Sequence, residues 1–437
     1  MKNSISGFSK LSKEEKITWL SKTYLKNATA AVDVLKQYWN PDAKLQQLHD
    51  EFTENTVSNF YLPFGIAPNF VINERSYAVP MVVEESSVIA AASKAAKFWA
   101  VRGGFKTKVL GTKKTGQVHF MFPGKKENLI SFFNHCRPKM LEQTQHISKN
   151  MEKRGGGIVD IELKDKTREL PNYYQLHATF ETLDAMGANF INSCLEQFGK
   201  TFEFEAQKFP RFSAEEKQLR VVMAILSNYV PECLVRAEVN CPVEEFSEAG
   251  IDGKTFAKKF IQAVKIAEIE PIRAVTHNKG IMNGVDAVVL ATGNDFRAVE
   301  AGVHAFAAKD GKYTSLTHAK VENGIFYFWI EIPLALGTVG GLTNLHPLVK
   351  AALEILQRPS AKELMEIAAA AGLAQNFAAV KSLVTTGIQK GHMKMHLLNM
   401  LNQHQATDVE KATIIEQFET RPITHSAVVK AIEELRQ

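Results

Sequence analysis

The chain has 437 residues, and 52 lysines and arginines against 47 aspartates and glutamates give a formal charge of +5. It is 45% apolar, 23% charged and 9% aromatic, which is typical of a globular protein and excludes a disordered, collagen-like or disulfide-scaffold chain. At about 100–200 residues per domain, the length predicts two or three domains. The charge is too small to indicate nucleic-acid binding and allows only a modest attraction for anionic small molecules.

The cysteines and the apolar runs indicate the compartment. Cys136, Cys194, Cys233 and Cys241 are scattered and form no CxxC, as expected in a reducing compartment without structural zinc. The start, MKNSISGFSKLSKEEKITWL, lacks the apolar core of a secretory signal. No apolar run approaches the ~18 residues of a membrane helix. We therefore expect a soluble cytoplasmic protein with no membrane or nucleic-acid partner.

The N-terminal part of the chain predicts helices, then a strand, then a further helix. In the first 55 or so residues, apolar side chains recur at helical spacing. Residues 77–83 alternate like a strand. The run SSVIAAASKAAKFWAV follows as a helix, with Ser86 or Ser87 as its N-cap and Gly103 past its end.

Residues 112–228 show a regular succession of strands and helices. We expect strands at 117–122, 158–163, 174–180 and 219–226, a helix over about 125–153, and a helix capped by Asp184 and closed by Gly199. This β-α-β-β-α-β order is that of a ferredoxin-like unit.

The chain then returns to mixed α and β structure. The pattern predicts a buried strand at 285–291, a turn at 292–295 leading into a helix, a strand at 324–332, and Ala-rich helices beyond 341. The expected fold class is α+β. Residues 1–111 and 229–385 form a large mixed α/β domain, 112–228 form an inserted small domain, and 386–437 form a C-terminal helical appendage.

Several familiar fingerprints are missing. No GxGxxG follows a predicted strand, so the usual Rossmann phosphate loop is absent. Gly253-Lys254-Thr255 resembles a Walker tail, but the required upstream glycine position holds Glu248. His392 and His396 are four residues apart, yet no third ligand is suggested, so we expect no metal.

Three polar features allow a functional and a structural interpretation. Glu84-Glu85 could favour a helix dipole or include an acid that carries a proton. Lys279, between flanking glycines and asparagines in 276–284, could stabilise an oxyanion or be a solvated loop lysine. Asp295 could be an N-cap or belong to a catalytic group. Taken singly, none of these features decides.

Taken together, a series of runs resembles 3-hydroxy-3-methylglutaryl-coenzyme A (HMG-CoA) reductase, specifically its soluble bacterial class II branch. The runs are Glu54-Asn55, Asn69-Phe70, VPMVVEESSVIAAAS (79–93), DAMGANFIN (184–192), ILSN (225–228), RAVTHNKGIMNGVDAVVLATGNDFRAVEAG (273–302), GTVGG (337–341), GLAQN (372–376) and GHM (391–393). The resemblance extends from about residue 50 to 400. Ser86 departs from the family, which usually has proline there, but no reacting group is missing.

The resemblance implies a reaction in two hydride transfers. HMG-CoA is reduced to a mevaldyl-CoA hemithioacetal, coenzyme A leaves, and mevaldehyde is reduced to mevalonate. By this resemblance, Lys279 would be the cation that neutralises the developing oxyanion, and Glu85 would be the proton donor. It places Asp295 between these two groups, tuning both, and makes His392 the group that protonates the coenzyme A thiolate.

The resemblance also implies the binding residues and the assembly. The acyl substrate would contact Ser87, Ile225, Arg273, Asn283 and Gln375, and the dinucleotide would contact Asp184, Met186, Gly187, Asn189 and Asn228. The inserted domain would then be the cofactor domain, and 386–437 a mobile flap that delivers His392. We expect a homodimer or higher homo-oligomer with the active site at the dimer interface.

Cofactor preference is predicted from one position. Family members that prefer NAD have an acidic residue seven positions before the triple glycine that starts at Gly155, and this chain has Ser148 there. A carboxylate would repel a ribose 2′-phosphate, whereas a serine with Lys149, Lys153 and Arg154 nearby could accept it. We therefore expect Ser148 to contact the cofactor and NADP(H) to be preferred over NAD(H).

Other functions remain open. One is another coenzyme A-linked dehydrogenase on the same scaffold, and another is the same enzyme working in the oxidative, degradative direction. An RNA-binding module would need aromatic and basic side chains interleaved on its sheet, but strand 158–163 has no aromatic residue and two acids.

Overall fold

The computed structural model describes residues 4–385, 387, 397–418 and 421–436. It divides into two compact units, Met1–Pro63 and Phe64–Gln437. The first division therefore falls at residue 63, within the segment that the sequence assigned to the first part of the large domain.

The first unit is helical. Its elements are the 3₁₀ helix η1 (Phe8–Lys10) and helices α1 (Lys13–Tyr24), α2 (Ala28–Gln37) and α3 (Ala43–Asp50). Ser12 and Glu15 form a reciprocal capping box at the start of α1, and the Asp42 side chain accepts from the N–H groups of Lys44 and Leu45. These helices confirm the helical prediction for the start of the chain.

The second unit contains a strand pair and a four-stranded sheet outside its small inserted part. The strands are β1 (Phe64–Ile72), β2 (Arg75–Val82), β3 (Lys106–Val109), β8 (Leu234–Pro242), β9 (Thr317–Glu322) and β10 (Ile325–Pro333). β1 pairs with β2, and the four-stranded sheet has the order β3-β8-β10-β9, antiparallel throughout. Side chains of β10 alternate between buried and half-buried, as its sequence predicts.

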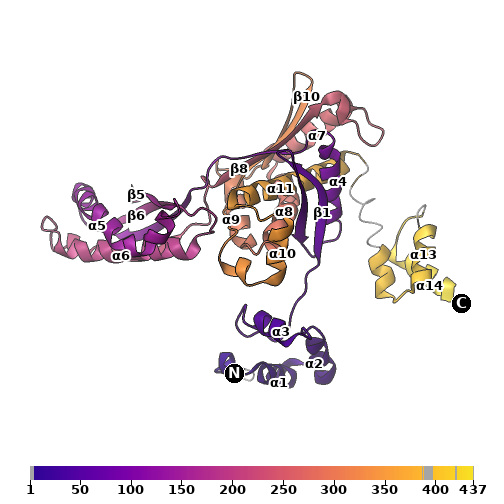
Figure 1. Cartoon of the computed structure of the whole chain (residues 1–437), viewed down its shortest axis with the longest axis horizontal. Helices are drawn as coiled ribbons and strands as arrows, with labels where there is room; N and C mark the ends of the chain where they lie inside the picture. The colour runs from indigo at the N-terminus through magenta and orange to yellow at the C-terminus, as the bar shows by residue number, and fades with distance from the viewer. Residues whose placement is uncertain (1–3, 386, 388–396, 419–420, 437) are drawn as a thin grey trace. The chain divides into compact units, whose positions relative to one another are not determined.

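Helices pack onto these strands around one hydrophobic core. They are α4 (Val88–Ala100), α7 (Gly253–Ile269), α8 (Pro271–Ala291), α9 (Phe296–Ala307), α10 (Pro347–Ile355) and α11 (Ala361–Val384), with 3₁₀ turns η3 (Val243–Phe246) and η4 (Gly341–Asn344). α8 and α11 lie side by side in the middle of this part (Figure 1). An aromatic cluster lies between helices and sheet and joins them through its ring contacts. It consists of Trp99, Phe246, Phe326 and Phe377.

Helix α8 corrects two sequence predictions. Residues 285–291 are not a strand, and 276–284 is not a loop between strands, because both belong to one 21-residue helix. The C-terminal half of α8 is buried on nearly all sides, so it lacks the polar face that makes a helix recognisable from sequence. Pro271 at the first turn, with Glu270 as N-cap, is the start signal that the pattern contained.

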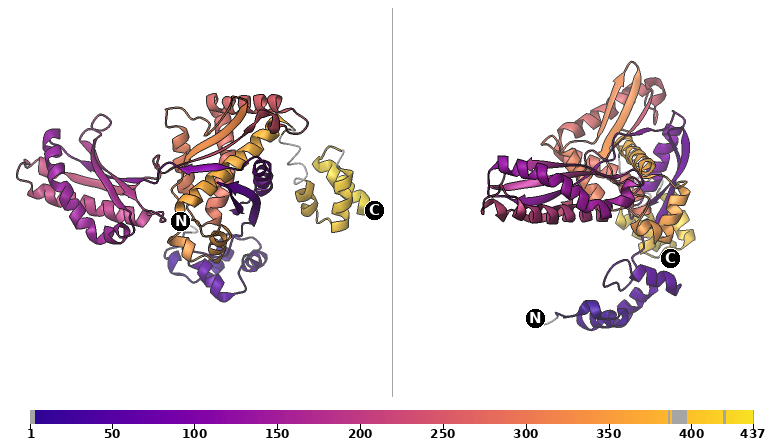
Figure 2. Two further views of the ribbon diagram at one scale, coloured as in Figure 1. Left: turned by 45° about the horizontal axis from the view of Figure 1, so that its top comes forward. Right: turned by 60° about the vertical axis from the view of Figure 1, so that its left-hand side comes forward.

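The inserted part, here called the small sheet unit (Lys114–Leu226), has its own core. Its elements are β4 (Lys114–Met121), α5 (Lys126–Glu152), β5 (Gly157–Asp165), β6 (Tyr173–Glu181), α6 (Ala188–Lys208), η2 (Glu216–Gln218) and β7 (Arg220–Leu226). The sheet is antiparallel with order β5-β6-β4-β7. α5 and α6 lie together along one face of this sheet and enclose the core (Figures 1 and 2).

Helix α6 differs from its predicted bounds at both ends. Asp184 is not its cap, because the helix begins at Ala188 after Gly187. It also continues through Gly199 to Lys208, so the Phe-rich piece at 201–206 is its last part. Gly199 lies where α6 crosses the sheet, with Val118 and Val221 3.4–3.5 Å from the place of a Cβ. A Cβ there would make ordinary van der Waals contacts, so Gly199 neither ends the helix nor is required by packing.

The C-terminal segment forms a separate helical cluster. Helices α13 (Asp408–Gln417) and α14 (His425–Arg436) are described there, and Arg436 Nε bonds Glu410 Oε1 at 2.7 Å. Its buried residues form their own core, which includes Leu401, Ile414 and Val428. The predicted helical appendage is thus present, while the predicted flap residue His392 lies outside the described residues.

One helix among the described residues, α11, is long and apolar enough to cross a membrane by length and composition alone. Of its apolar window, 67% is buried inside the fold. A core helix passes the same test, so α11 gives only weak evidence for a membrane span.

Candidate active site

A charge pair joins α8 to the loop before α4. Lys279 Nζ lies 2.6 Å from Glu85 Oε2, and Asn283 Nδ2 lies 3.4 Å from the same oxygen. Lys279 and Asn283 are four residues apart, so they share one face of α8. The Lys279 and Glu85 side chains are 59% and 37% exposed, so a substrate can reach the pair.

A cavity of about 300 Å³ opens beside this pair. It is lined by Glu85, Ser87, Asn283 and Gln375, together with small side chains of α4 and α11. Gln375 is buried, and its Oε1 has no hydrogen-bond partner among the described residues. A buried amide oxygen without a partner is costly, which favours a ligand that donates to it. The structure thus brings together three of the predicted acyl-binding residues.

Close approach of α8 and α11 builds this cavity wall. A Cβ on Gly284 would lie 2.5 Å from the carbonyl oxygen of Ala371 and 2.9 Å from Cβ of Gln375. Only glycine permits this distance between the helices, and it places Gln375 near Asn283. The glycine in the run MNG is therefore required by packing rather than by a turn.

Arg273 lies in a second, adjoining cavity of about 550 Å³. Thr276, His277 and Asn376 line it too, and Ala379 lines both cavities. Burial lowers the pKa of Arg273 and lowers the pKa of His277 to about 3. Among the described residues Arg273 has no carboxylate partner, so its guanidinium can receive an anion. Sequence reasoning missed Thr276, although its i+3 spacing from Arg273 was a usable signal.

Among the described residues, Asp295 forms no hydrogen bond or ion pair with Lys279. Its carboxylate caps α9, accepting from the N–H groups of Arg297 and Ala298, and it pairs with Arg297 at 3.2 Å. From Lys279 to Ala291 the axis of α8 rises by about 18 Å, because each residue adds about 1.5 Å. The neighbouring Phe296 lines the cavity of Lys279 and Glu85, so the expected position of Asp295 between these two groups stays a prediction.

Asp286 is a further acid beside the pair that sequence reasoning missed. It shares a cavity of about 280 Å³ with Glu85, Lys279, Glu300 and His304. Burial, together with the neighbouring Glu300 carboxyl, raises the pKa of Asp286 to about 8. Asp286 lies seven residues after Lys279, on the same helix face, which was the available signal.

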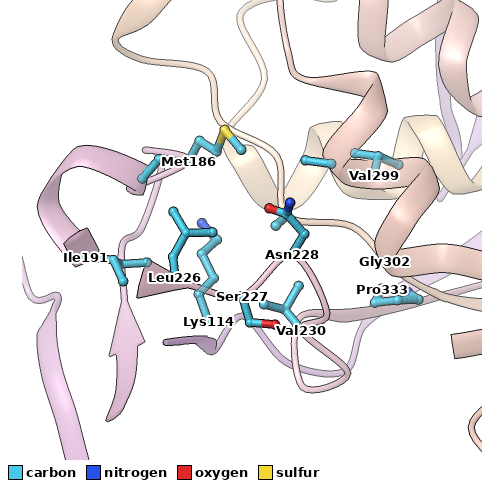
Figure 3. A pocket seen from close by; sticks show the side chains of 13 residues that line it. Lys114, Met186, Ile191, Leu226, Ser227, Asn228, Val230, Val299, Gly302 and Pro333 are labelled. Atoms are coloured by element: carbon cyan, nitrogen blue, oxygen red, sulfur yellow. The ribbon is translucent and has the colours of Figure 1, made fainter. Parts of the chain in front are cut away.

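The residues predicted to bind the dinucleotide lie where the small sheet unit meets the remainder of the second unit. Met186 and Asn228 line a narrow cavity of about 30 Å³ with Lys114 (Figure 3). Gly187 has φ +87° and precedes α6, whose first turn has no side-chain cap. Asn189 is exposed in that turn. Asp184 accepts from the backbone N–H of Ala361 at 2.7 Å.

Two predicted contacts lie elsewhere. Ser148 is 1% exposed on the core-facing side of α5, and its hydroxyl has no partner among the described residues, so the predicted contact with a 2′-phosphate is wrong for this conformation. Ile225 is 46% exposed on β7 and does not line the cavity of Glu85.

Within the described part of the chain, no group of His, Cys, Asp and Glu side chains could hold a metal ion, and all four cysteines are free and buried.

Comparison with known proteins identifies the family. The model of the hydroxymethylglutaryl-coenzyme A reductase family matches residues 12–397. The chain is 36% identical over 428 residues to a 3-hydroxy-3-methylglutaryl-coenzyme A reductase of Archaeoglobus fulgidus, covering 95% of this chain and 91% of that protein. It is 33% identical over 379 residues to a probable reductase of Borreliella burgdorferi, covering 85% and 84%.

A solved structure matches as well. The class II reductase of Streptococcus pneumoniae, bound to NADPH in open conformations, superposes with a TM-score of 0.71 at 34% identity, covering 94% of this chain and all of that one. That reductase, which is bound to NADPH, shares the mixed α and β fold of this chain. The chain belongs to the hydroxymethylglutaryl-coenzyme A reductase family, whose reaction is the reduction of HMG-CoA to mevalonate.

Proposed function

We propose that the chain catalyses the four-electron reductive deacylation of HMG-CoA to mevalonate and coenzyme A, consuming two NAD(P)H and two protons. The observation that carries the proposal is the Lys279–Glu85 pair at 2.6 Å beside the cavity lined by Ser87, Asn283 and Gln375. Mevaldyl-CoA hemithioacetal and mevaldehyde are the intermediates. The alternatives are another coenzyme A-linked dehydrogenase and the same enzyme in the oxidative direction.

Lys279 and Glu85 divide the chemistry at the carbonyl carbon. The nicotinamide supplies the hydride when bound. The Lys279 ammonium, already exposed to the cavity, then faces the oxygen on which negative charge develops. Glu85 lies within hydrogen-bond distance of that ammonium, so a protonated Glu85 can donate to the same oxygen in the aldehyde step. Arg273 would receive the free carboxylate of the acyl group or a coenzyme A phosphate, with Thr276 beside it.

We propose that Asp295 and Ile225 reach the site from a second copy of the chain. In one chain Asp295 caps α9 and pairs with Arg297 rather than with Lys279, and Ile225 is exposed on β7. A homodimer, or a higher assembly built from it, with the active site at its interface would supply both residues. Exposed apolar side chains such as Val222, Met223 and Ile225 also favour coverage of this edge.

We propose that His392 protonates the departing coenzyme A thiolate and that the segment 386–437 acts as a flap. An imidazole titrates near neutrality and suits this role. The separate core of the C-terminal cluster supports a segment that moves as one body.

The small sheet unit is proposed to be an inserted ferredoxin-like domain (112–228) that binds the dinucleotide. Its strand order and its two helices on one face support this assignment. The residues present fit such a cofactor, since the uncapped first turn of α6 offers free N–H groups to a phosphate and Gly187 has the positive φ of a tight approach. The large domain would comprise 1–111 and 229–385.

NADP(H) is proposed as the preferred cofactor, with NAD(H) used less well. Because Ser148 is buried, the preference is now assigned to Lys149, Lys153 and Arg154, which are exposed at the end of α5. Their charges favour a 2′-phosphate. We further propose a soluble, cytoplasmic enzyme without membrane or nucleic-acid partners, in keeping with the largely buried α11.

The test is an assay of the purified protein with HMG-CoA and NADPH, followed by identification of the product. We expect mevalonate and free coenzyme A, with two NADPH oxidised for each mevalonate. A product other than mevalonate would favour another coenzyme A-linked dehydrogenase. Comparing turnover from mevalonate with NADP⁺ and coenzyme A decides the preferred direction.

A further inference from the structure

Lys114 carries a buried ammonium at the first residue of β4. Its side chain is 5% exposed, and Nζ lies 2.5 Å from Thr182 Oγ1 and 2.9 Å from the carbonyl oxygen of Ala185. It forms no ion pair in the part of the chain that the structure describes. Burial lowers the pKa of Lys114, while Cys233, Glu181 and Asp184 act in the opposite direction from farther away.

Stability does not explain a lysine at this place. Burying a charge against neutral partners is unfavourable, and an apolar side chain of the same length would avoid that cost. An ammonium has three N–H donors, and the two hydrogen bonds of Lys114 leave one. Lys114 also lines a narrow cavity together with Met186 and Asn228 (Figure 3). The lysine therefore points to a role in binding.

The two acceptors of Lys114 belong to the loop Thr182–Gly187, directly before α6. Thr182 Oγ1 donates to the carbonyl oxygen of Ala185 at 2.7 Å, so Lys114, Thr182 and Ala185 form one closed set of hydrogen bonds. A Cβ on Gly187 would lie 2.4 Å from Thr182 Cγ2. The Thr182 side chain thus fills the space under Gly187, and Lys114 fixes Thr182 there.

The other side of the loop contacts the remainder of the second unit. The backbone N–H of Thr338 donates to the carbonyl oxygen of Asp184 at 2.8 Å, and the N–H of Ala361 donates to Asp184 Oδ1 at 2.7 Å. A Cβ on Gly337 would lie 2.4 Å from the backbone nitrogen of Met186. Asp184 is therefore tied to the start of α11, whereas Lys114 is the anchor of the loop within the small sheet unit.

We propose that Lys114 is a positioning residue for the nicotinamide dinucleotide. It fixes the backbone of Thr182–Gly187, from which Met186 and Gly187 face the cofactor, and it adds a positive charge beneath an anionic ligand. It does not touch the cavity of Lys279 and Glu85. This inference rests on the proposed function, because it assumes that the loop before α6 binds the dinucleotide.

The experiment compares Lys114→Met with the wild type, measuring direct NADPH binding by fluorescence and KM for each substrate. We expect Kd and KM for NADPH to rise about tenfold, equivalent to about 1.4 kcal/mol, with KM for HMG-CoA unchanged. Lys113→Met is the matched control. The Lys113 side chain is half exposed and its Nζ lies 3.4 Å from Glu232 Oε2, so its loss should leave both constants unchanged.

Unchanged NADPH affinity in folded Lys114→Met would overturn the inference, and so would equal rises in KM for NADPH and HMG-CoA. If Lys114→Met does not fold, Thr182→Val removes the hydroxyl that Lys114 bonds and should also weaken NADPH binding. Unchanged binding in that variant would overturn the inference too. Because NADPH binding is measured without turnover, a wild type that makes no mevalonate would refute the proposed function alone.

Discussion

At the scale of single residues, carboxyl groups near Lys279 differ in what surrounds them. Glu85 accepts from Lys279 in an open cavity, whereas Asp286 lies one turn beyond Asn283 among buried side chains. Of these two carboxyl groups, that of Asp286 has a buried oxygen, Oδ1, with no hydrogen-bond partner among the described residues. Glu85, which pairs with Lys279, is thus accessible to solvent, whereas Asp286, whose pKa is strongly raised, is buried close to the pair.

This difference predicts a pH-dependent stability. The pKa of Asp286 rises from 3.8 to about 8 in the folded protein, so the folded state binds this proton more tightly. Its stabilising contribution is present below the unfolded pKa and is lost as the pH rises through about 8. Asp286→Asn removes the titration, and its free energy of unfolding relative to the wild type should increase between about pH 5 and pH 8. Urea unfolding at both pH values measures this. An effect of equal size at both would show that Asp286 does not titrate there.

Side-chain direction on α5 gives a second prediction. Ser148 faces the core, so Ser148→Asp should bury a carboxylate and lower the melting temperature rather than switch the cofactor. Lys153→Glu, at the exposed end of α5, should lower kcat/KM for NADPH relative to NADH. The measurement is the ratio of the two kcat/KM values in each variant. A well-folded Ser148→Asp protein that prefers NADH would restore the original prediction.

At the scale of elements, the sequence predicts best where a helix or strand has one polar face. The bounds of α5 and β10 agree with the pattern to within a few residues. The prediction for α8 was wrong because the C-terminal half of this helix is buried nearly all round, and the prediction for α6 was wrong because Gly199 lies inside the helix rather than at its end. Local chemistry allowed Asp295 to be an N-cap or part of a catalytic group, and the structure confirms that it caps α9.

In the candidate site, too, the sequence identifies some residues and misses others. Lys279, Asn283 and Gln375 could be singled out because their motifs are specific, and the structure brings them to adjoining surfaces of α8 and α11. Asp286, Thr276 and Lys114 were missed, since each becomes notable only when its burial or its cavity is known. Single residues of this kind carry no pattern that a sequence window can detect.

Truncation tests the independence of the C-terminal segment. Its buried residues form a cluster separate from the main core, so ending the chain before 386 should expose no part of that core. We expect a folded protein that binds NADPH but turns over poorly, because His392 is lost. Circular dichroism, NADPH binding and kcat give the three readouts. An insoluble truncated protein would show that the segment belongs to the core.

At the scale of the whole molecule, we propose that one active site takes Lys279 from one chain and Asp295 from a second chain. Mixing Lys279→Ala and Asp295→Asn proteins under subunit exchange should restore part of the activity. One of the two active sites of each mixed dimer would then contain both an unmodified Lys279 and an unmodified Asp295. Asparagine is also a good N-cap, so Asp295→Asn should fold. Mixtures that stay inactive, although mass spectrometry shows mixed dimers, would place both residues in the site of one chain.

Lys279 is proposed to stabilise the developing oxyanion in both reductions, and its replacement by alanine tests this role. Lys279→Ala is assayed separately for reduction of HMG-CoA and of mevaldehyde, with its fold checked by circular dichroism. If the same ammonium faces the oxyanion in both steps, as we propose, kcat should fall by about 10²–10³ or more in each. The exposed side chain should leave the fold intact. A folded Lys279→Ala protein that retains near wild-type turnover in either step would contradict the account.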